Sequence, residues 1–144
     1  MAKIEKSIII DAPVEKVFEF MVDPGNLPEI WPSLVEVKDV KQTPEGVGSS
    51  YRWVYKMAGM RFEGETETIE YVPNQKVVVK DKGGIEATRT VTFQPENGGT
   101  KYTTSAEYTV PIPLLGKLAE AFILRQNEHE ADMVLANLKD RMES

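Results

Sequence analysis

Apolar and polar residues alternate through the middle of the chain, from about Ser49 to Val110, in five runs separated by short turns that carry Gly or Pro. A period of two is typical of strands with one buried face. Two similar runs come earlier, so the pattern predicts seven strands. Their expected ranges are Lys3–Ile10, Leu34–Val40, Tyr51–Met57, Met60–Tyr71, Gln75–Lys82, Ile85–Phe93 and Tyr102–Val110.

Helical spacing marks a short segment directly after the first predicted strand. Its apolar residues recur at i, i+3, i+4 and i+7, which places them on one helix face; they are Val14, Val17, Phe18 and Met21. We expect Asp11 to supply a capping side chain and Pro13 to occupy the first turn. A second short helix or tight loop is predicted from Leu27 to Trp31.

A helix of about 30 residues is predicted at the end of the chain, from near Pro113 to Met142, with a length of roughly 45 Å. Its apolar stripe changes direction along the helix. The first set of apolar residues leads toward His129 and Met133, and a rotated set continues through Leu135. Either the helix curves across the sheet and packs on different partners along its length, or its first half forms a flexible lid over a pocket.

The turn at Ala58-Gly59 sets the register of the central hairpin. A two-residue loop there pairs Tyr55 with Phe62 and places Trp53 over Gly64, an arrangement that supports a bend at the glycine. The opposite face then carries the charged side chains, which are Arg52, Lys56, Glu63, Glu65 and Glu67. We interpret that face as a solvated surface of ion pairs; a cation site built from the three glutamates is the alternative.

The next hairpin, about Gly83-Gly84, admits two registers. A two-residue loop places the valines of its first strand on the face of Thr88 and Thr90. A three-residue loop instead gathers them with the apolar residues of the second strand, and we prefer this register. The residues that then share one face are Val77, Val79, Ala87, Arg89 and Val91.

Composition limits the class of protein. With 144 residues the chain can bury its own core, and we predict a single domain over residues 1–144. The absence of cysteine excludes disulfides and thiolate metal sites, and a net charge of −6 argues against nucleic-acid binding. The sequence contains no nucleotide-binding or metal-binding spacing, so no cofactor is expected. It also contains no signal-like or bilayer-spanning segment, so we expect a cytoplasmic protein.

Five short motifs occur in an order that is itself informative: Ile10-Asp11-Ala12-Pro13-Val14-Glu15-Lys16-Val17-Phe18, Asp23-Pro24 leading to Trp31-Pro32, Gly46-Val47-Gly48, Tyr71-Val72-Pro73 and Gly98-Gly99-Thr100. Together they resemble the START-like superfamily, also called the birch-pollen-allergen fold, and its polyketide cyclase/dehydrase branch. The resemblance covers essentially the whole chain. It implies an α+β helix-grip fold: a curved seven-stranded antiparallel sheet, two short N-terminal helices, and a long C-terminal helix over an internal cavity.

This superfamily does not assign one activity, because its members include aromatic polyketide cyclases, lipid and sterol carriers, quinone-binding proteins and hormone receptors. The aromatic residues of the expected concave face either fill a solid core or line an apolar pocket. With the resemblance, we predict a pocket. The candidate ligand-binding residues are Trp31, Tyr51, Trp53, Tyr55, Phe62, Arg89, Val91, Tyr108, Leu118, Phe122, His129 and Met133.

Arg89 and His129 are weak candidates for a chemical role, and no catalytic residue is assigned. Arg89 alternates with apolar residues, and a buried guanidinium needs a partner: a helix carboxylate such as Glu128, a water, or an anionic ligand group. The last option predicts that Arg89→Ala weakens an acidic ligand far more than a neutral one. His129, the one histidine, could act as an acid or base, but a lone helical histidine is more often a structural residue.

The sequence therefore predicts a protein that binds or transports a small hydrophobic or amphipathic molecule, such as a lipid, isoprenoid, quinone or polycyclic compound. An aromatic polyketide cyclase or dehydrase is the first alternative, with tyrosines, Arg89 or His129 moving protons. A protein–protein interaction module, using the start of the long helix and the Trp31 loop, is the second. We expect a monomer or a weak dimer.

Overall fold

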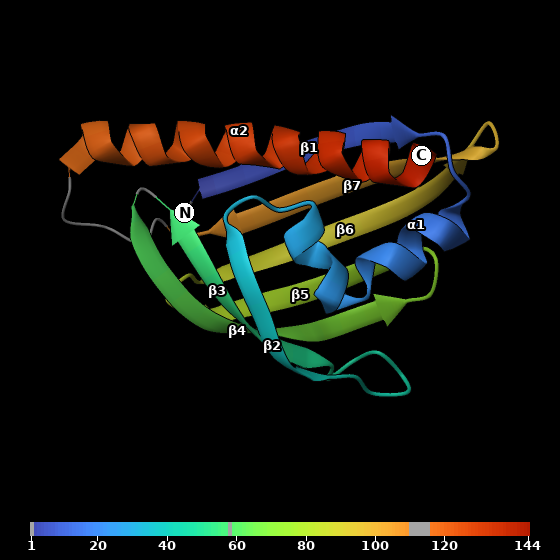
Figure 1. The fold of residues 1–144 in the computed structure, drawn as a ribbon, viewed down its shortest axis with the longest axis horizontal. Helices are drawn as coiled ribbons and strands as arrows, with labels where there is room; N and C mark the ends of the chain where they lie inside the picture. Colours follow the sequence, from blue (N-terminus) through green and yellow to red (C-terminus); the bar gives the residue numbers. More distant parts are fainter. Residues whose placement is uncertain (1, 58, 110–115) are drawn as a thin grey trace.

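An antiparallel sheet of seven strands forms the body of the structure (Figure 1). The structure is a computed structural model that describes residues 2–57, 59–109 and 116–144, without the side chains of residues 2, 116–120, 122 and 123. The spatial order is β1-β7-β6-β5-β4-β3-β2, so β2 to β7 each lie beside their neighbours in sequence and β1 pairs with β7. The strands are β1 Ala2–Ile10, β2 Leu34–Lys41, β3 Ser50–Met57, β4 Met60–Val72, β5 Lys76–Gly83, β6 Ala87–Glu96 and β7 Gly99–Tyr108.

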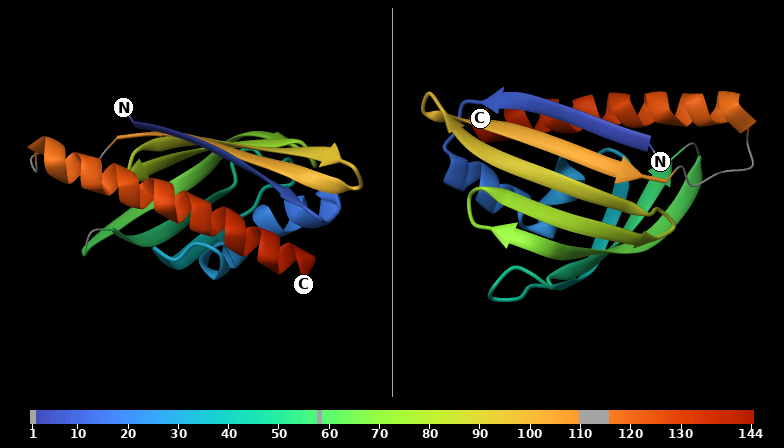
Figure 2. Two further views of the ribbon diagram at one scale, coloured as in Figure 1. Left: turned by 90° about the horizontal axis from the view of Figure 1, so that it is seen from above. Right: turned by 180° about the vertical axis from the view of Figure 1, so that it is seen from behind.

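The helices lie on the concave side of this sheet (Figures 1 and 2). The α-helix α1 (Val14–Met21) and the 3-10 helix η1 (Pro24–Glu29) connect β1 to β2, and α2 (Gly116–Glu143) ends the chain. Helix α2 runs beside β1 along the sheet, as both views in Figure 2 show. These elements confirm the predicted α+β architecture of a seven-stranded antiparallel sheet, two short N-terminal helices and a long C-terminal helix.

The start of α1 differs from the sequence prediction. Pro13 is its N-cap, with an extended backbone (φ −66°, ψ 151°), and no side chain caps the helix. The predicted cap by Asp11 was wrong because Asp11 lies two residues before Pro13, out of reach of the N–H groups of the first turn. The backbone N–H of Asp11 instead donates to Oε2 of Glu143 at 2.8 Å, which joins this turn to the end of α2.

The predicted register of the central hairpin is confirmed. Tyr55 pairs with Phe62 and Trp53 pairs with Gly64. A Cβ atom built on Gly64 would lie 2.3 Å from Cζ2 of Trp53 and 2.3 Å from the carbonyl oxygen of Lys82. The indole ring therefore occupies the space that a side chain at position 64 would need.

The preferred register of the next hairpin is confirmed as well. Val79 pairs with Arg89 and Val77 pairs with Val91, so these residues share one face of the sheet. The loop is longer than predicted, since the last pair of the ladder is Asp81 with Ala87. The end of β5 pairs with β4 instead, where Gly83 lies opposite Gly64.

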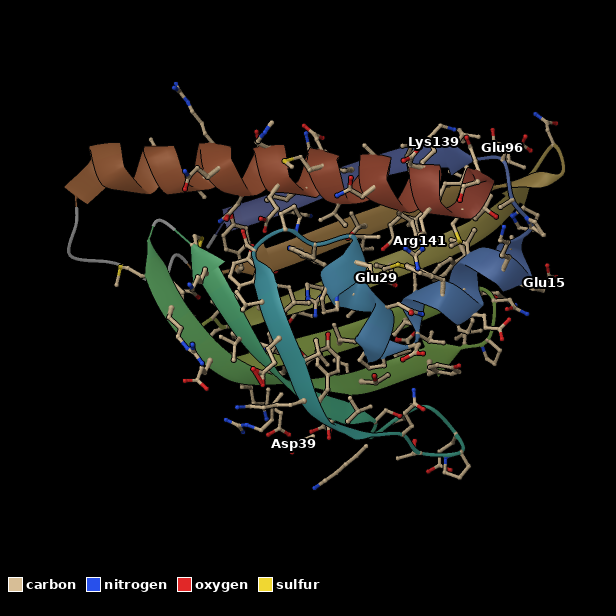
Figure 3. All side chains as sticks on the ribbon, viewed as in Figure 1. Glu15, Glu29, Asp39, Glu96, Lys139 and Arg141 are labelled. Atoms are coloured by element: carbon tan, nitrogen blue, oxygen red, sulfur yellow. The ribbon has the colours of Figure 1, made fainter. Side chains whose placement is uncertain are left out.

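The buried apolar residues form two clusters at different places between sheet and helices. One cluster joins α1 and the last turns of α2 to β6 and β7, with Phe18, Phe93 and Leu138 among its members. The other is centred on Trp53 and Met57. Charged side chains project from the outer surface (Figure 3), where Arg141 on α2 pairs with Glu29 on η1 at 2.8 Å. No helix in the described ranges is long and apolar enough to cross a membrane.

Candidate functional site: a divided internal cavity

Two adjacent chambers lie between the sheet and the helices. The first has a volume of about 150 Å³ and the second about 270 Å³. Both are lined by Leu27, Trp31, Tyr51 and Arg89, so these four side chains form the wall between them. A void of this kind requires that the curved sheet stand away from α2, which the position of Trp53 over Gly64 supports.

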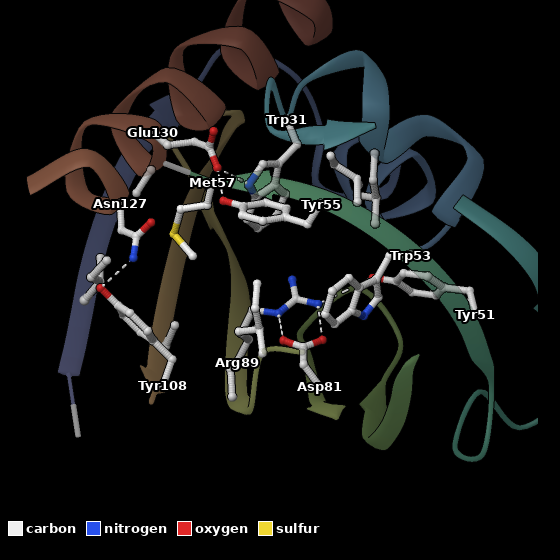
Figure 4. A pocket seen from close by; sticks show the side chains of 17 residues that line it. Trp31, Tyr51, Trp53, Tyr55, Met57, Asp81, Arg89, Tyr108, Asn127 and Glu130 are labelled. Atoms are coloured by element: carbon white, nitrogen blue, oxygen red, sulfur yellow. Dashed lines mark hydrogen bonds and ion pairs between the residues drawn. The ribbon is translucent and has the colours of Figure 1, made fainter. Parts of the chain in front are cut away.

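The first chamber is mainly apolar and aromatic (Figure 4). Strand β3 contributes every second residue, because alternate side chains of a strand face the same side. Its lining residues are Ile4, Leu27, Trp31, Leu34, Tyr51, Trp53, Tyr55, Met57, Asp81, Ile85, Ala87, Arg89, Ala106, Tyr108, Asn127, Glu130 and Ala131.

Arg89 and Asp81 form an ion pair in the wall of this chamber (Figure 4). Nε of Arg89 donates to Oδ2 of Asp81 at 2.7 Å, and Nη2 donates to Oδ1 at 3.0 Å and to the hydroxyl of Tyr51 at 3.4 Å. Thr66 also donates a hydrogen bond to Asp81. Burial acts against the charge of Arg89, but the charge of Asp81 together with the interactions with Tyr51 and the hydrogen bonds to both residues outweighs it, so the pKa of Arg89 is raised.

The side chain of Glu130 on α2 accepts hydrogen bonds from three residues at the other side of the chamber. Its Oε1 accepts from Nε1 of Trp31 at 2.9 Å and from the hydroxyl of Tyr55. Its Oε2 accepts from the backbone N–H of Ser33 at 3.2 Å and from the hydroxyl of Ser33. Burial, and then the charge of Glu130, raise the pKa of Tyr55 well above its ordinary value, so Tyr55 stays a hydrogen-bond donor. Glu130 thus ties α2 to the wall residue Trp31 and to β3.

Most of the predicted ligand-binding residues do line these chambers. Trp31, Tyr51, Trp53, Tyr55, Arg89 and Tyr108 line the first, and Val91 lines the second. Phe62 is buried beside Trp53 but lines neither chamber. His129 and Met133 are exposed and also lie outside both. Leu118 and Phe122 fall outside the described side chains.

Sequence reasoning missed Asp81, Asn127 and Glu130. Asp81 could have been found, because it follows Val77 and Val79 at the spacing of one strand face and the preferred register brings it next to Arg89. Arg89 pairs with this strand residue and not with Glu128, the helix carboxylate that the sequence suggested. Glu130 carried no such signal, since a glutamate on a long polar helix is usually solvated.

The three glutamates of β4 lie on the outer face, away from the chambers. Glu65 pairs with Arg52 at 3.7 Å, and Glu63 lies 3.9 Å from Lys38 and 3.8 Å from Arg61. Exposed pairs of this kind contribute at most about 1 kcal/mol each. The ion-pair interpretation of this face therefore fits, and no group of three potential metal ligands occurs in the described residues.

The fold is similar to that of several solved structures. TTHA0849 from Thermus thermophilus has a TM-score of 0.84 at 22% identity, covering 98% of this chain and 97% of that one. The Zhui aromatase/cyclase from Streptomyces sp. R1128 has a TM-score of 0.80 at 14% identity, covering 99% and 93%. Ara h 8.0201 has a TM-score of 0.70 at 11% identity, covering 98% and 97%. At these identities the likeness establishes the fold alone, the helix-grip fold.

Comparison with families gives a more specific result. No curated protein matches the chain. A family model described as polyketide cyclase / dehydrase and lipid transport matches residues 1–143, which is nearly the whole chain. The resemblance predicted from the sequence is therefore confirmed, and the chain belongs to the polyketide cyclase / dehydrase and lipid transport family.

Proposed function

We propose that this protein binds a small hydrophobic or amphipathic molecule in the divided cavity between the sheet and α2. The observation that carries the proposal is the first chamber, whose wall is formed largely by aliphatic and aromatic side chains with a few polar groups at fixed positions. This composition is typical of ligand sites. The family description, which includes lipid transport, supports the same function.

The charged groups of the cavity wall are arranged to tolerate an apolar ligand. Arg89 and Asp81 neutralise each other, and the carboxylate of Glu130 accepts hydrogen bonds from Trp31, Ser33 and Tyr55. A buried charge that loses its partner costs several kcal/mol. An apolar molecule that displaces water from this cavity avoids that cost, because these charged groups keep their partners within the protein. Nη1 of Arg89 has no hydrogen-bond partner among the described residues, so it can still donate to a ligand oxygen.

An aromatic polyketide cyclase or dehydrase is the second candidate. The family description and the similarity to the Zhui aromatase/cyclase favour it. Against it, the carboxylates in the wall are already engaged: Asp81 by Arg89 and Thr66, and Glu130 by the donors described above. A general base needs an available lone pair directed at the substrate. One experiment distinguishes the two hypotheses: the protein is incubated with a polyketide-like β-polyketone, and cyclised product is followed by mass spectrometry. An enzyme should form this product, and a carrier should not.

The interaction-module alternative has less support. The ring of Trp31 belongs to the cavity wall, with its Nε1 bonded to Glu130, so the Trp31 loop does not offer this ring as an exposed surface. The start of the long helix lies outside the described side chains. The cytoplasmic location and the monomeric or weakly dimeric state stay predictions.

The direct test is a fluorescence titration with N-phenylnaphthylamine, an uncharged apolar probe. We expect one probe molecule per protein, with energy transfer from Trp31 and Trp53, which line the first chamber. Ala131→Leu should weaken binding about tenfold or more, because Ala131 lines that chamber and the larger side chain fills part of about 150 Å³.

Ala136→Leu is the matched control. It makes the same change on the same helix at an exposed position, so probe affinity should stay at the wild-type value. Equal affinity for wild type, Ala131→Leu and Ala136→Leu, or binding that persists after unfolding, would contradict the proposed site. Native mass spectrometry of the purified protein, with extraction of any bound molecule, would then identify the natural ligand.

A further inference from the structure

The second chamber presents a different set of groups from the first. Serine, threonine and tyrosine hydroxyls from the β2–β3 loop and the sheet line it, together with aliphatic side chains. No carboxylate belongs to its lining in the described part of the chain, whereas the first chamber contains Asp81 and Glu130. Its cationic side chains are Lys41, which is exposed, and Arg89, which Asp81 neutralises. The chamber is therefore suited to a ligand oxygen that accepts hydrogen bonds and carries no full negative charge.

Tyr102 is a buried hydrogen-bond donor in the wall of this chamber. Its side chain is 2% exposed and its ring packs edge-on against Phe93, with centroids 5.4 Å apart. Its hydroxyl makes no hydrogen bond with any described residue. Burial raises the pKa of Tyr102 far above its ordinary value, although the nearby charge of Arg89 acts in the opposite direction. The phenol is therefore a neutral donor in the chamber wall, where a bound molecule can accept its hydrogen bond.

Other donors could also hold a ligand oxygen, and they are less suitable. Nη1 of Arg89 lies in the wall shared by both chambers, beside the charge of Asp81. The hydroxyls of Tyr71 and Thr104 belong to side chains that are only half-buried. The hydroxyl of Tyr108 accepts a hydrogen bond from Asn127 at 3.1 Å and keeps its own O–H to donate, but it lies in the first chamber, which also contains the carboxylates of Asp81 and Glu130. Nε1 of Trp53 also has no partner among the described residues, but this nitrogen is buried, so a molecule in the chamber cannot reach it. Tyr102 combines a free hydroxyl with a position in a chamber wall.

The sizes of the chambers show why a ligand would extend from one into the other. A cavity of about 150 Å³ holds a molecule of the size of benzene, and the first chamber has this volume. Drug-sized and lipid-like ligands occupy about 300–1,000 Å³. A larger ligand therefore needs the second chamber too. To extend into that chamber, the ligand must pass the shared wall, where the guanidinium of Arg89 lies 5.5 Å from the ring centroid of Trp31.

We propose that the second chamber binds the oxygen-bearing end of the ligand, with Tyr102 donating a hydrogen bond to an uncharged carbonyl oxygen while the apolar body of the molecule lies in the first chamber. This inference rests on the proposed function. It narrows the ligand class to neutral amphipathic molecules with a carbonyl group at one end. A carboxylate gains less, because Asp81 neutralises the charge of Arg89.

The test compares naphthyl methyl ketone, ethylnaphthalene and naphthoate, which share one ring system and differ at one end. Calorimetric titration should give the ketone an affinity about tenfold higher than ethylnaphthalene, the effect of one good hydrogen bond. Tyr102→Phe keeps the ring and removes the hydroxyl. It should abolish the advantage of the ketone and leave ethylnaphthalene binding unchanged. Naphthoate should bind no better than the ketone.

A vibrational measurement separates a direct contact from an effect on structure. With an isotope-labelled carbonyl, the stretching frequency of the bound ketone should be lower in wild type than in Tyr102→Phe, because a donated hydrogen bond weakens the carbonyl bond. Tyr108→Phe is the control in the first chamber and should leave the frequency unchanged.

The outcomes distinguish this inference from the proposed function. If ethylnaphthalene binds but Tyr102→Phe changes neither the ketone affinity nor the frequency, the role of Tyr102 is wrong and the apolar site stands. A frequency shift in Tyr108→Phe instead would place the carbonyl in the first chamber and overturn the inference. If neither naphthalene binds, the proposed function fails as well.

Discussion

Arg89 illustrates how a single buried charge can be kept in an apolar cavity. Its side chain is 21% exposed and that of Asp81 is 9% exposed, and two hydrogen bonds join them. Removing one partner of such a pair leaves an uncompensated charge, whereas replacing both partners with apolar residues is often tolerated.

Asp81→Asn should therefore lower the free energy of unfolding by about 3 kcal/mol, measured by urea denaturation. The double change Asp81→Leu with Arg89→Met should recover most of this loss, because it leaves no unpaired charge at this position of the wall. A loss below about 1 kcal/mol in Asp81→Asn would instead mean that water in the cavity solvates Arg89 well enough without Asp81.

The residue scale is also where sequence reasoning was weakest. The tyrosines and Trp53 of the first chamber follow from alternation along β3 and could be predicted, whereas Glu130 could not. A carboxylate on a helix is assigned to solvent unless its partners are known, and those partners, Trp31, Ser33 and Tyr55, lie 75 to 99 residues away along the chain on other elements. His129 shows the converse: its residue type made it a candidate for ligand binding, and the structure places it at an exposed position outside both chambers.

At the scale of elements, the indole ring of Trp53 packs directly on Gly64 in the β3–β4 hairpin. Alternation and turn length were enough to predict this pairing, because a shift by one residue would have placed aromatic and charged side chains on the same face. The start of α1 was less predictable. The sequence placed Pro13 in the first turn, whereas Pro13 is the N-cap, so the helix begins after it and Asp11 is too far away to cap it.

Gly64→Ala should destabilise the protein by about 2–3 kcal/mol, because the added methyl group would overlap the Trp53 ring and the carbonyl of Lys82, each at 2.3 Å. Thermal unfolding followed by circular dichroism would measure the loss. Gly25→Ala is the control: its nearest neighbour is the side chain of Asp23 at 3.3 Å, which can move. Similar stability in both variants would show that the sheet does not need this close contact in order to bend.

At the scale of the whole molecule, the volume of the two chambers depends on residues that no local pattern connects. The first chamber takes its wall from β1, η1, β2, β3, β5, β6, β7 and α2. The order of elements predicted that sheet and helix would face each other, but the division into two chambers depends on where Trp31 lies once Glu130 holds it. Such a void lowers stability, because its lining residues lose the packing contacts that a solid core would give them.

Ala106→Leu tests this relation between empty volume and function. Ala106 lies on β7 opposite Arg89 and lines the first chamber, so a larger side chain there should raise the unfolding temperature of the ligand-free protein, in line with about 0.5–2 kcal/mol for cavity filling. The same variant should lose most of the stabilisation by N-phenylnaphthylamine, which for wild type at about a hundredfold excess over Kd is about 2.7 kcal/mol. Differential scanning calorimetry with and without the probe measures both effects.

Ser105→Leu, on the opposite face of the same strand, should leave the probe-induced shift at its wild-type size. If Ala106→Leu keeps the full shift, the probe binds elsewhere and the first chamber is only a packing defect; if it loses the shift while gaining stability, the protein has retained the void for a ligand.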